Sequence, residues 1–297
     1  MSKAEERKIL FVMNPVSGDV SKEHVREQVD SFCQKHSFAH KFFETSGKDD
    51  LSVLQDEFRD YQPDTVVAMG GDGTINLVVG AISGTKIHLG IIPMGSANGL
   101  ATELLIPRNV EQALQLVAQN RTRPLDLLYV DDLPAAHLCD IGFNARLVKR
   151  FSKEKVRGFG SYAKHFWEVL RTNKPNRYSL KFKDGHEESF KAHMVIVTNS
   201  QKYGTGAVIN PQGKPNDGKF EVVVVRYYSP LHILQIFFAL FLRTIDKMHY
   251  VFTYSADEVE LINHKKESVN VDGEIIGNPV NIHFRNKPKA IKVIVPK

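Results

Sequence analysis

The sequence predicts an α/β protein of two domains, and three observations predict it. Residues 1–124 alternate short β-branched, apolar runs with helical patterns, which is typical of a doubly wound parallel sheet. After Arg121-Thr-Arg-Pro124 the pattern changes to short strands separated by turns, which predicts a β-rich, antiparallel, sandwich-like domain over residues 125–286. A chain of 297 residues with 42% hydrophobic residues is long enough for two such domains.

The first domain is predicted from strands that are each followed by a helix. The expected strands are residues 9–13, 40–44, 65–69 and 88–92, and the expected helices are residues 22–36, 50–60, 75–82, 97–104 and 110–120. Because a helix returns the chain to the start of the next strand, neighbouring strands run parallel, with helices on both faces of the sheet.

The second domain is predicted from alternating strands and turn dipeptides. The expected strands are residues 125–130, 135–141, 178–183, 190–198, 220–225, 258–263, 268–271 and 280–284, and the expected helices are residues 161–171 and 229–242. Asp184-Gly185 is a dipeptide that tight hairpin turns favour. The sequence contains no internal repeat and no low-complexity segment.

Three polar, glycine-containing loops follow predicted strands of the first domain. They are Asn14-Pro15-Val16-Ser17-Gly18, Gly70-Gly71-Asp72-Gly73 and Gly95-Ser96-Ala97-Asn98. Loops at the carboxyl ends of parallel strands share one edge of the sheet, where open α/β sheets bind ligands. Glycine lets the backbone approach a polyphosphate, and the free amides of a helix N-terminus point at its charge.

The second loop carries further polar groups. We expect Thr74 to cap the following helix, and we expect Asp72, in an exposed loop, to place a carboxylate where phosphates and a divalent cation meet. A single glycine-rich turn often only reverses the chain. The set of three loops therefore predicts a phosphate site more strongly than any one of them.

The cysteines and the apolar stretches restrict the location of the protein. Cys33 and Cys139 are far apart in sequence and form no metal or redox spacing. The N-terminal residues are charged and resemble no signal peptide, so a reducing, cytoplasmic location is expected. The longest apolar stretch, residues 231–242, is too short to span a bilayer. It is either a buried helix or an apolar surface against lipid or a second copy of the chain, as in a homodimer.

The net charge of +5 has two explanations. A basic run holds Lys149, Arg150, Lys153, Lys155 and Arg157. Such a run is commonly a solvated helix face. It would also suit peripheral contact with an anionic membrane, at roughly 1 kcal/mol per basic residue. Nucleic acid is not an expected partner, because no recognition motif or stacking pattern is present.

The motifs together resemble a known family. Asn14 to Gly18, Gly70-Gly-Asp-Gly-Thr-Ile-Asn76, Gly95 to Asn98, Asn216-Asp217-Gly218 and Asp272-Gly273-Glu274 resemble, in order and approximate spacing, the bacterial diacylglycerol kinase and lipid kinase family. That family is related to sphingosine and ceramide kinases and, more distantly, to NAD kinases. The resemblance implies an ATP- and Mg²⁺-dependent kinase that phosphorylates a lipid hydroxyl. It also implies that a C-terminal strand, within residues 287–297, returns to the first domain.

The resemblance implies roles for particular residues. Asp272 would accept the proton of the attacking hydroxyl, Glu274 would orient it or help to hold Mg²⁺, and Asp72 is the next candidate base. The residues implied to contact ATP are Asn14, Gly18, Thr45, Gly70, Gly71, Asp72, Gly73, Thr74, Asn76, Gly95, Ser96 and Asn98. Thr45 has the alternative role of a helix cap, Asn14 and Asn98 that of turn residues, and Asp272-Gly273 that of a hairpin turn.

A second cation site is implied in the second domain. Some relatives bind a structural cation through an aspartate and neighbouring carbonyls, which correspond here to Asp217 and to the carbonyls of Lys214 and Lys219. A plain turn explains this segment equally well. The lipid cleft is expected in the second domain, where Gly142, Phe143, Phe166 and Trp167 are candidate lining residues.

Two departures from the family pattern restrict the class of lipid expected as substrate. Many diacylglycerol kinases have an aspartate where this chain has Gly99. Sphingosine kinases use acidic residues after a Gly-Phe pair to bind an amine, whereas the segment 144–150 here is basic. A neutral or anionic lipid is therefore favoured, diacylglycerol among them. An NAD kinase and a nucleotide-sensing protein without catalysis remain alternatives, although Asn14-Pro15 and Asp272-Gly273-Glu274 argue against the first.

Overall fold

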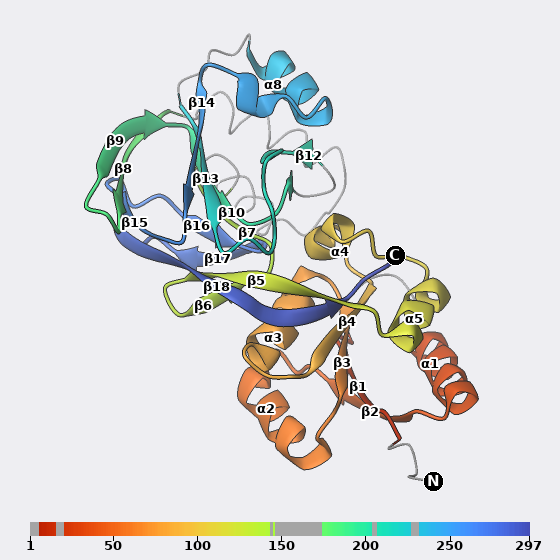
Figure 1. Ribbon diagram of the computed structural model, residues 1–297. Helices are drawn as coiled ribbons and strands as arrows, with labels where there is room; N and C mark the ends of the chain where they lie inside the picture. The colour runs from red at the N-terminus through yellow and green to blue at the C-terminus, as the bar shows by residue number, and fades with distance from the viewer. Residues whose placement is uncertain (1–5, 16–20, 143–144, 146–173, 204–206, 227–231) are drawn as a thin grey trace. The chain divides into compact units, whose positions relative to one another are not determined.

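The computed structural model describes residues 6–15, 21–142, 145, 174–203, 207–226 and 232–297 (Figure 1). The chain divides into two compact units. Unit 1 comprises Met1–Leu125 and Lys289–Lys297, and unit 2 comprises Asp126–Pro288. Unit 1 has a parallel sheet covered by helices and unit 2 is an antiparallel β sandwich, so the predicted fold class is confirmed.

Unit 1 is built on buried parallel strands. β2 (Ala39–Glu44), β1 (Lys8–Met13), β3 (Thr65–Gly70) and β4 (His88–Pro93) lie side by side in that order. The last residues of β18 (Asn281–Ile294) extend the sheet, because Lys292 and Val293 pair in parallel with β4. β1 and β3 are almost wholly buried, which explains why they are continuous apolar runs in the sequence.

Helices cover both faces of this sheet. They are α1 (Lys22–His36), α2 (Asp50–Tyr61), α3 (Asp72–Ile82), α4 (Gly99–Glu103) and α5 (Val110–Gln119). α1 and α5 pack with Phe11 and Met69 in one core, whereas α2 contacts α3, which packs on β3. The hydroxyl of Ser21 caps α1 by accepting from the amide of His24, and Asn109 caps α5 in the same way.

The start of α3 differs from the prediction. The helix begins at Asp72, and its N-cap is Gly71 in extended conformation. Thr74 is therefore buried within the first turn and caps nothing. The glycine turn is shorter than expected because the helix starts directly after the strand and its two glycines.

Unit 2 contains two antiparallel sheets. In one, the strand order is β14 (Val251–Ala256), β13 (Phe220–Val225), β10 (Met194–Thr198), β7 (Leu138–Gly142), β16 (Val269–Val271) and β17 (Glu274–Gly277). In the other, the strand order is β18, β15 (Glu258–Asn263), β8 (Asn176–Phe182) and β9 (Glu187–Ala192). β5 (Thr122–Val130) also pairs with β18, and β6 (Leu133–Ala135) pairs with β5. Side chains of both sheets, including Tyr178, Phe220 and Phe284, form one core.

Smaller elements complete unit 2. They are the short pair β11 (Lys202–Tyr203) and β12 (Ala207–Val208), helix α8 (His232–Phe241) and the 3₁₀ turn η1 (Ile245–Lys247). No helix in the described part of the chain is both long enough and apolar enough to cross a bilayer. The predicted helix 161–171, with Phe166 and Trp167, lies outside the described residues, as does the basic run from Lys149 to Arg157.

Two predicted strands of unit 2 are each divided in the structure. The run 135–141 breaks into β6 and β7 at residues 136–137, and the run 190–198 breaks into β9 and β10 at His193. β9 and β10 belong to different sheets, so the chain passes from one layer to the other at His193. β14 was not predicted.

One buried asparagine fixes the base of the β16–β17 hairpin. Asn263 is fully buried, and its side-chain amide donates to the carbonyls of Glu267, at 2.8 Å, and Pro279, at 3.0 Å. Its Oδ1 accepts from the amide of Glu267 at 2.9 Å. These bonds hold together the two chain segments that lead into and out of the hairpin carrying Asp272.

We expect Asn263→Ala to lower the free energy of unfolding of unit 2 by about 2–4 kcal/mol, because one amide and two carbonyls lose their partner in a buried site. Urea unfolding followed by circular dichroism measures this loss. Asn278→Ala is the matched control, since this exposed asparagine also donates to a nearby carbonyl, that of Lys266. It should cost less than about 1 kcal/mol, and equal losses in the two variants would contradict the role of Asn263.

Candidate functional site

Loops at the carboxyl ends of four parallel strands meet in unit 1. The amide of Thr45, after β2, donates to the carbonyl of Met13 at 3.0 Å, and the amide of Asn14, after β1, donates to that of Met69 at 3.2 Å. The amide of Met94, after β4, donates to the carbonyl of Gly70 at 2.8 Å. We call residues 14–15, 45, 70–76 and 95–98 the strand-end loops. Of the residues predicted to contact ATP, they contain all but Gly18, which lies outside the described residues.

Two glycines bring the second and third loops into backbone contact. A Cβ atom on Gly95 would lie 2.5 Å from the Cα of Gly71, and one on Gly71 would lie 3.3 Å from the Cα of Gly95. Gly70 is equally restricted, because its Cβ would lie 2.2 Å from Oγ1 of Thr74. Glycine is therefore needed here for close packing of the loops, whether or not a phosphate is bound.

Asn98 holds the third loop rigid. It is buried and adopts left-handed backbone geometry with φ of 53°. Its Oδ1 accepts from the amide of Gly95 at 2.9 Å, and its Nδ2 donates to the carbonyl of Gly95 at 2.6 Å. Since both ends of the side-chain amide bind the loop itself, Asn98 serves the shape of the loop. The neighbouring Ser96 is exposed, and its carbonyl accepts from Arg108 at 3.3 Å.

The N-terminus of α3 presents backbone amides without a side-chain cap. Its N-cap is Gly71, which has no side chain to accept from the first turn. Gly73 is exposed, and Asn76 lies half-buried one turn later. The helix has 11 residues, so its dipole adds to the attraction that these amides exert on an anion.

Asp72 lies at the junction of the two loops. Its Oδ1 accepts from the amide of Gly99, the first residue of α4, at 2.6 Å. The carboxyl is half-buried at the start of a helix, so the expectation of an exposed loop was wrong. Burial raises the pKa of Asp72, although backbone amides, that of Gly99 first, oppose the shift. Gly99, which departs from the family pattern, thus contributes its backbone N–H to this carboxylate.

Thr45 does not cap the following helix. The N-cap residue of α2 is Asp49, and the carboxylate of Asp50 accepts from the amides of Ser46 and Gly47, each at 2.8 Å. These bonds order the loop without Thr45. Of the two roles considered for Thr45, the structure excludes the cap.

In unit 2, Asp272 and Gly273 form the tight turn between β16 and β17. Their φ angles are 48° and 95°, as in the two-residue hairpin turn that Asp-Gly favours. The carboxylate of Asp272 is clamped by the chain between β6 and β7. Its Oδ2 accepts from the amide of Ala136 at 2.6 Å, and its Oδ1 accepts from those of His137 at 3.0 Å and Leu138 at 2.8 Å.

The surroundings of Asp272 were missed by sequence reasoning. Residues 136–138 were expected inside one continuous strand, but the strand is broken at 136–137 and the amides of all three residues donate to the carboxylate. Three N–H donors fix the orientation of the carboxylate and stabilise its charge. Burial lowers the pKa of His137 to about 4, so this imidazole beside the clamp is neutral at neutral pH. Glu274, two residues after Asp272, is exposed.

The segment 214–219 is a surface turn. Asp217 is exposed, and its Oδ1 accepts from the amide of Lys219 at 3.1 Å. Lys214 is also exposed, and the amide of Gly218 donates to Asp126 at 2.7 Å. Within the described residues, no group of three or more His, Cys, Asp or Glu side chains could hold a metal ion. Nothing in the turn selects between the two roles proposed for Asp217.

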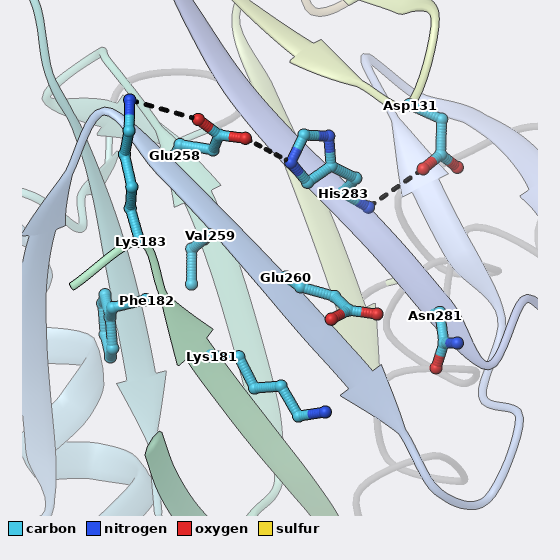
Figure 2. Close-up of a pocket in the computed structure, with 9 residues that line it drawn as sticks. All are labelled: Asp131, Lys181, Phe182, Lys183, Glu258, Val259, Glu260, Asn281 and His283. Carbon is cyan, nitrogen blue, oxygen red and sulfur yellow. Dashed lines mark hydrogen bonds and ion pairs between the residues drawn. The ribbon is translucent and has the colours of Figure 1, made fainter. Parts of the chain in front are cut away.

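A pocket of about 430 Å³ lies on the outer face of the sheet formed by β8, β15 and β18. Figure 2 shows Glu258 between Lys183 and His283, to which its carboxylate lies 3.5 Å and 2.8 Å away. The amide of His283 donates to Asp131 at 2.9 Å. None of the predicted site residues lines this pocket, where Glu258 pairs with both Lys183 and His283.

Comparison with known proteins matches the two halves of the chain to two domain families. Residues 8–130 match the diacylglycerol kinase catalytic domain, and residues 139–295 match the YegS C-terminal NAD kinase beta sandwich-like domain. Together the two models span almost the whole chain.

Individual relatives agree with this assignment. A protein of Bacillus subtilis (strain 168) named "Diacylglycerol kinase" is 26% identical over 97% of this chain and 96% of its own length. One of Klebsiella pneumoniae (strain 342) named "Probable lipid kinase YegS-like" is 32% identical over 58% of this chain and 59% of its own length. A crystal structure from Bacillus anthracis str. Sterne, assigned in its name to the diacylglycerol kinases, covers 98% of this chain and 97% of its own at a TM-score of 0.80 and 20% identity, which shows the shared fold.

We expect Asp72→Asn to raise the melting temperature at neutral pH. A carboxyl whose pKa is raised by folding favours the folded state below its ordinary pKa of 3.8 and loses that contribution as the pH rises through the shifted value. Asparagine cannot ionise, so the variant avoids this loss, and its advantage should shrink as the pH falls through the raised pKa and vanish below 3.8.

Thermal unfolding at several pH values measures the difference. Asp60→Asn, at an exposed position on α2, is the matched control and should leave the melting temperature almost unchanged. A lower melting temperature for Asp72→Asn at neutral pH would mean that the hydrogen bond from Gly99 outweighs the cost of burying the charge.

Proposed function

Because the chain belongs to the diacylglycerol kinase and lipid kinase family, we propose that it is an ATP- and Mg²⁺-dependent lipid kinase. It transfers the γ-phosphoryl group of ATP to a hydroxyl of diacylglycerol or of a related neutral or anionic lipid. The observation that carries the proposal is the set of strand-end loops, where an uncapped helix N-terminus and paired glycines occupy the ligand-binding edge of a parallel sheet.

The strand-end loops have the composition that a triphosphate requires. The amides at the start of α3 supply donors, and Gly71 and Gly95 let the two loops pack closely together. Asn98 keeps the loop in one shape, so little ordering is needed on binding. We assign the phosphates to residues 70–76 and 95–98, and the nucleoside to the side of Asn14 and Thr45.

The same loops offer one carboxylate for Mg²⁺. This ion is commonly held by one or two carboxylates together with substrate phosphates and water, and seldom by a protein cage. Asp72 fits that donor set, because its carboxylate stands at the N-terminus of α3, to which we assign the phosphates. When bound, Mg²⁺ neutralises charge on the phosphates during transfer.

Asp272 is assigned to the acceptor hydroxyl. Its three backbone donors hold the carboxylate in one orientation and stabilise its charge. Phosphoryl transfer with a loose transition state depends mainly on positioning and charge, so an oriented acceptor for the hydroxyl proton is sufficient. Glu274 is assigned to orienting the hydroxyl or to helping to hold Mg²⁺.

The lipid class follows from charge. The basic segment 144–150 would repel a cationic amine, so a neutral or anionic hydroxyl lipid is proposed. A cytoplasmic protein in peripheral contact with the membrane is part of this proposal, because its acceptor resides in the bilayer.

Incubation with labelled ATP and a total lipid extract, with the product identified by mass, tests the function. We expect an added phosphate on a neutral or anionic hydroxyl lipid, and a requirement for Mg²⁺. Phosphorylation of NAD in place of lipid would identify the NAD kinase alternative. ATP binding without any product would identify a nucleotide-sensing protein.

We expect Asp272→Asn to lower kcat by about 10²–10⁴-fold, because an amide cannot accept the proton of the hydroxyl. The Kd for ATP should change little, since ATP is assigned to unit 1. Steady-state kinetics and calorimetric titration measure the two quantities. Asp184→Asn is the matched control, because Asp184-Gly185 is a second Asp-Gly turn, between β8 and β9. An unchanged kcat in Asp272→Asn would move the base elsewhere, with Asp72 the next candidate.

A further inference from the structure

Helix α8 has an unusually apolar sequence. Eight of its ten residues, in the sequence HILQIFFALF, are apolar. Ile236, Ala239 and Leu240 pack against Val223 and other side chains on the face of the six-stranded sheet that points away from the sandwich core. A helix that covers a sheet with one face needs apolar residues on about half its circumference, and a helix that is apolar all round is typical of a fully buried or lipid-facing element.

One large apolar side chain directly after α8 is exposed. Leu242 is 70% exposed, directly after the last residue of the helix. A groove of about 570 Å³ runs beside it, lined in part by Gln235, Leu242, Lys247 and Tyr250. Figure 1 shows α8 at one end of unit 2, beside the end of β14.

Basic side chains surround this apolar segment. Arg243, Lys247 and His249 are exposed, and Arg243 is held by a hydrogen bond to Gln201 at 2.6 Å. Asp246 is the one acidic residue between positions 232 and 250, and it accepts from Gln212 at 3.3 Å. The combination of an apolar helix end with a basic rim is what anionic lipid surfaces bind.

We propose that α8 and residues 242–249, which we call the α8 surface, dock the protein on an anionic membrane. The inference rests on the proposed function, since a lipid kinase must reach an acceptor held in a bilayer. A second copy of the chain suits the α8 surface less well. A twofold interface would place the same basic rim against itself, whereas anionic headgroups complement it.

Co-sedimentation of the full chain with vesicles tests the docking. One set of vesicles is phosphatidylcholine alone, and the other is equal parts of phosphatidylcholine and phosphatidylglycerol. The protein should sediment with the anionic vesicles and not with the neutral ones, and added salt should release it. Equal binding to both sets would overturn the proposal, because the basic rim would then have no part in it.

Two variants locate the surface. Leu242→Glu removes an inserted side chain and adds a repelled charge, and Lys247→Glu reverses one charge of the rim, so each should weaken vesicle partitioning about tenfold or more. Leu105→Glu is the matched control, because Leu105 is 72% exposed but lies in unit 1. It should bind vesicles like the parent protein. Parent-like binding by Leu242→Glu, or an equal loss in Leu105→Glu, would overturn the proposal.

Two further readouts separate this inference from its rivals. Sedimentation velocity of Leu242→Glu reports on dimerisation, and a change from dimer to monomer with unchanged vesicle binding would assign the surface to a second copy and overturn docking. Turnover of a dispersed short-chain diacylglycerol should be unchanged in Leu242→Glu. If the parent phosphorylates no lipid yet binds anionic vesicles through Leu242, the proposed function fails while the docking surface stands.

Discussion

The site in unit 1 depends on the approach of two backbones, at Gly71 and Gly95. A methyl group on Gly95 would lie 2.5 Å from the Cα of Gly71 and would push the loops apart, and one on Gly71, 3.3 Å from the Cα of Gly95, would be tight. Their contact allows the hydrogen bond from the amide of Met94 to the carbonyl of Gly70. It also brings the carboxylate of Asp72 within 2.6 Å of the amide of Gly99. The shape of the loops therefore depends on the absence of side chains at Gly71 and Gly95, and the polar groups are arranged around the contact between these two residues.

The two carboxylates to which we assign catalytic roles, Asp72 and Asp272, have different surroundings. Asp72 is half-buried, and burial raises its pKa against the opposing amides, so holding its charge costs stability. Asp272 accepts hydrogen bonds from three backbone amides, which lie where the chain is irregular between β6 and β7. The first arrangement suits a group whose charge a cation will later compensate, and the second suits a group that must keep one orientation.

The fold was predictable wherever burial leaves a pattern in the sequence. Buried parallel strands such as β1 and β3 are continuous apolar runs that end at polar or glycine residues, and α1 was predicted at both ends. No glycine or proline occurs at His193, where the chain passes from one sheet to the other. One continuous strand was therefore expected there. The clamp on Asp272 was not predictable because its donors are backbone amides, which any sequence possesses. Asp272 itself was identified only by resemblance. The hydrogen bonds from the side chain of Asn98 to Gly95 were not predictable either, because they depend on the left-handed backbone conformation of Asn98, which the sequence does not reveal.

The path of β18 has a consequence for biosynthesis. This strand pairs with β15 in unit 2 through its first residues and with β4 in unit 1 through Lys292 and Val293. Unit 2 is thus inserted between two parts of unit 1, and the ribosome must make all of it before residues 289–297 become available. Until then β4 is a sheet edge with unpaired amides and carbonyls, a template for pairing with another chain. While unit 2 is being synthesised, this edge of unit 1 is therefore open to pairing with another chain.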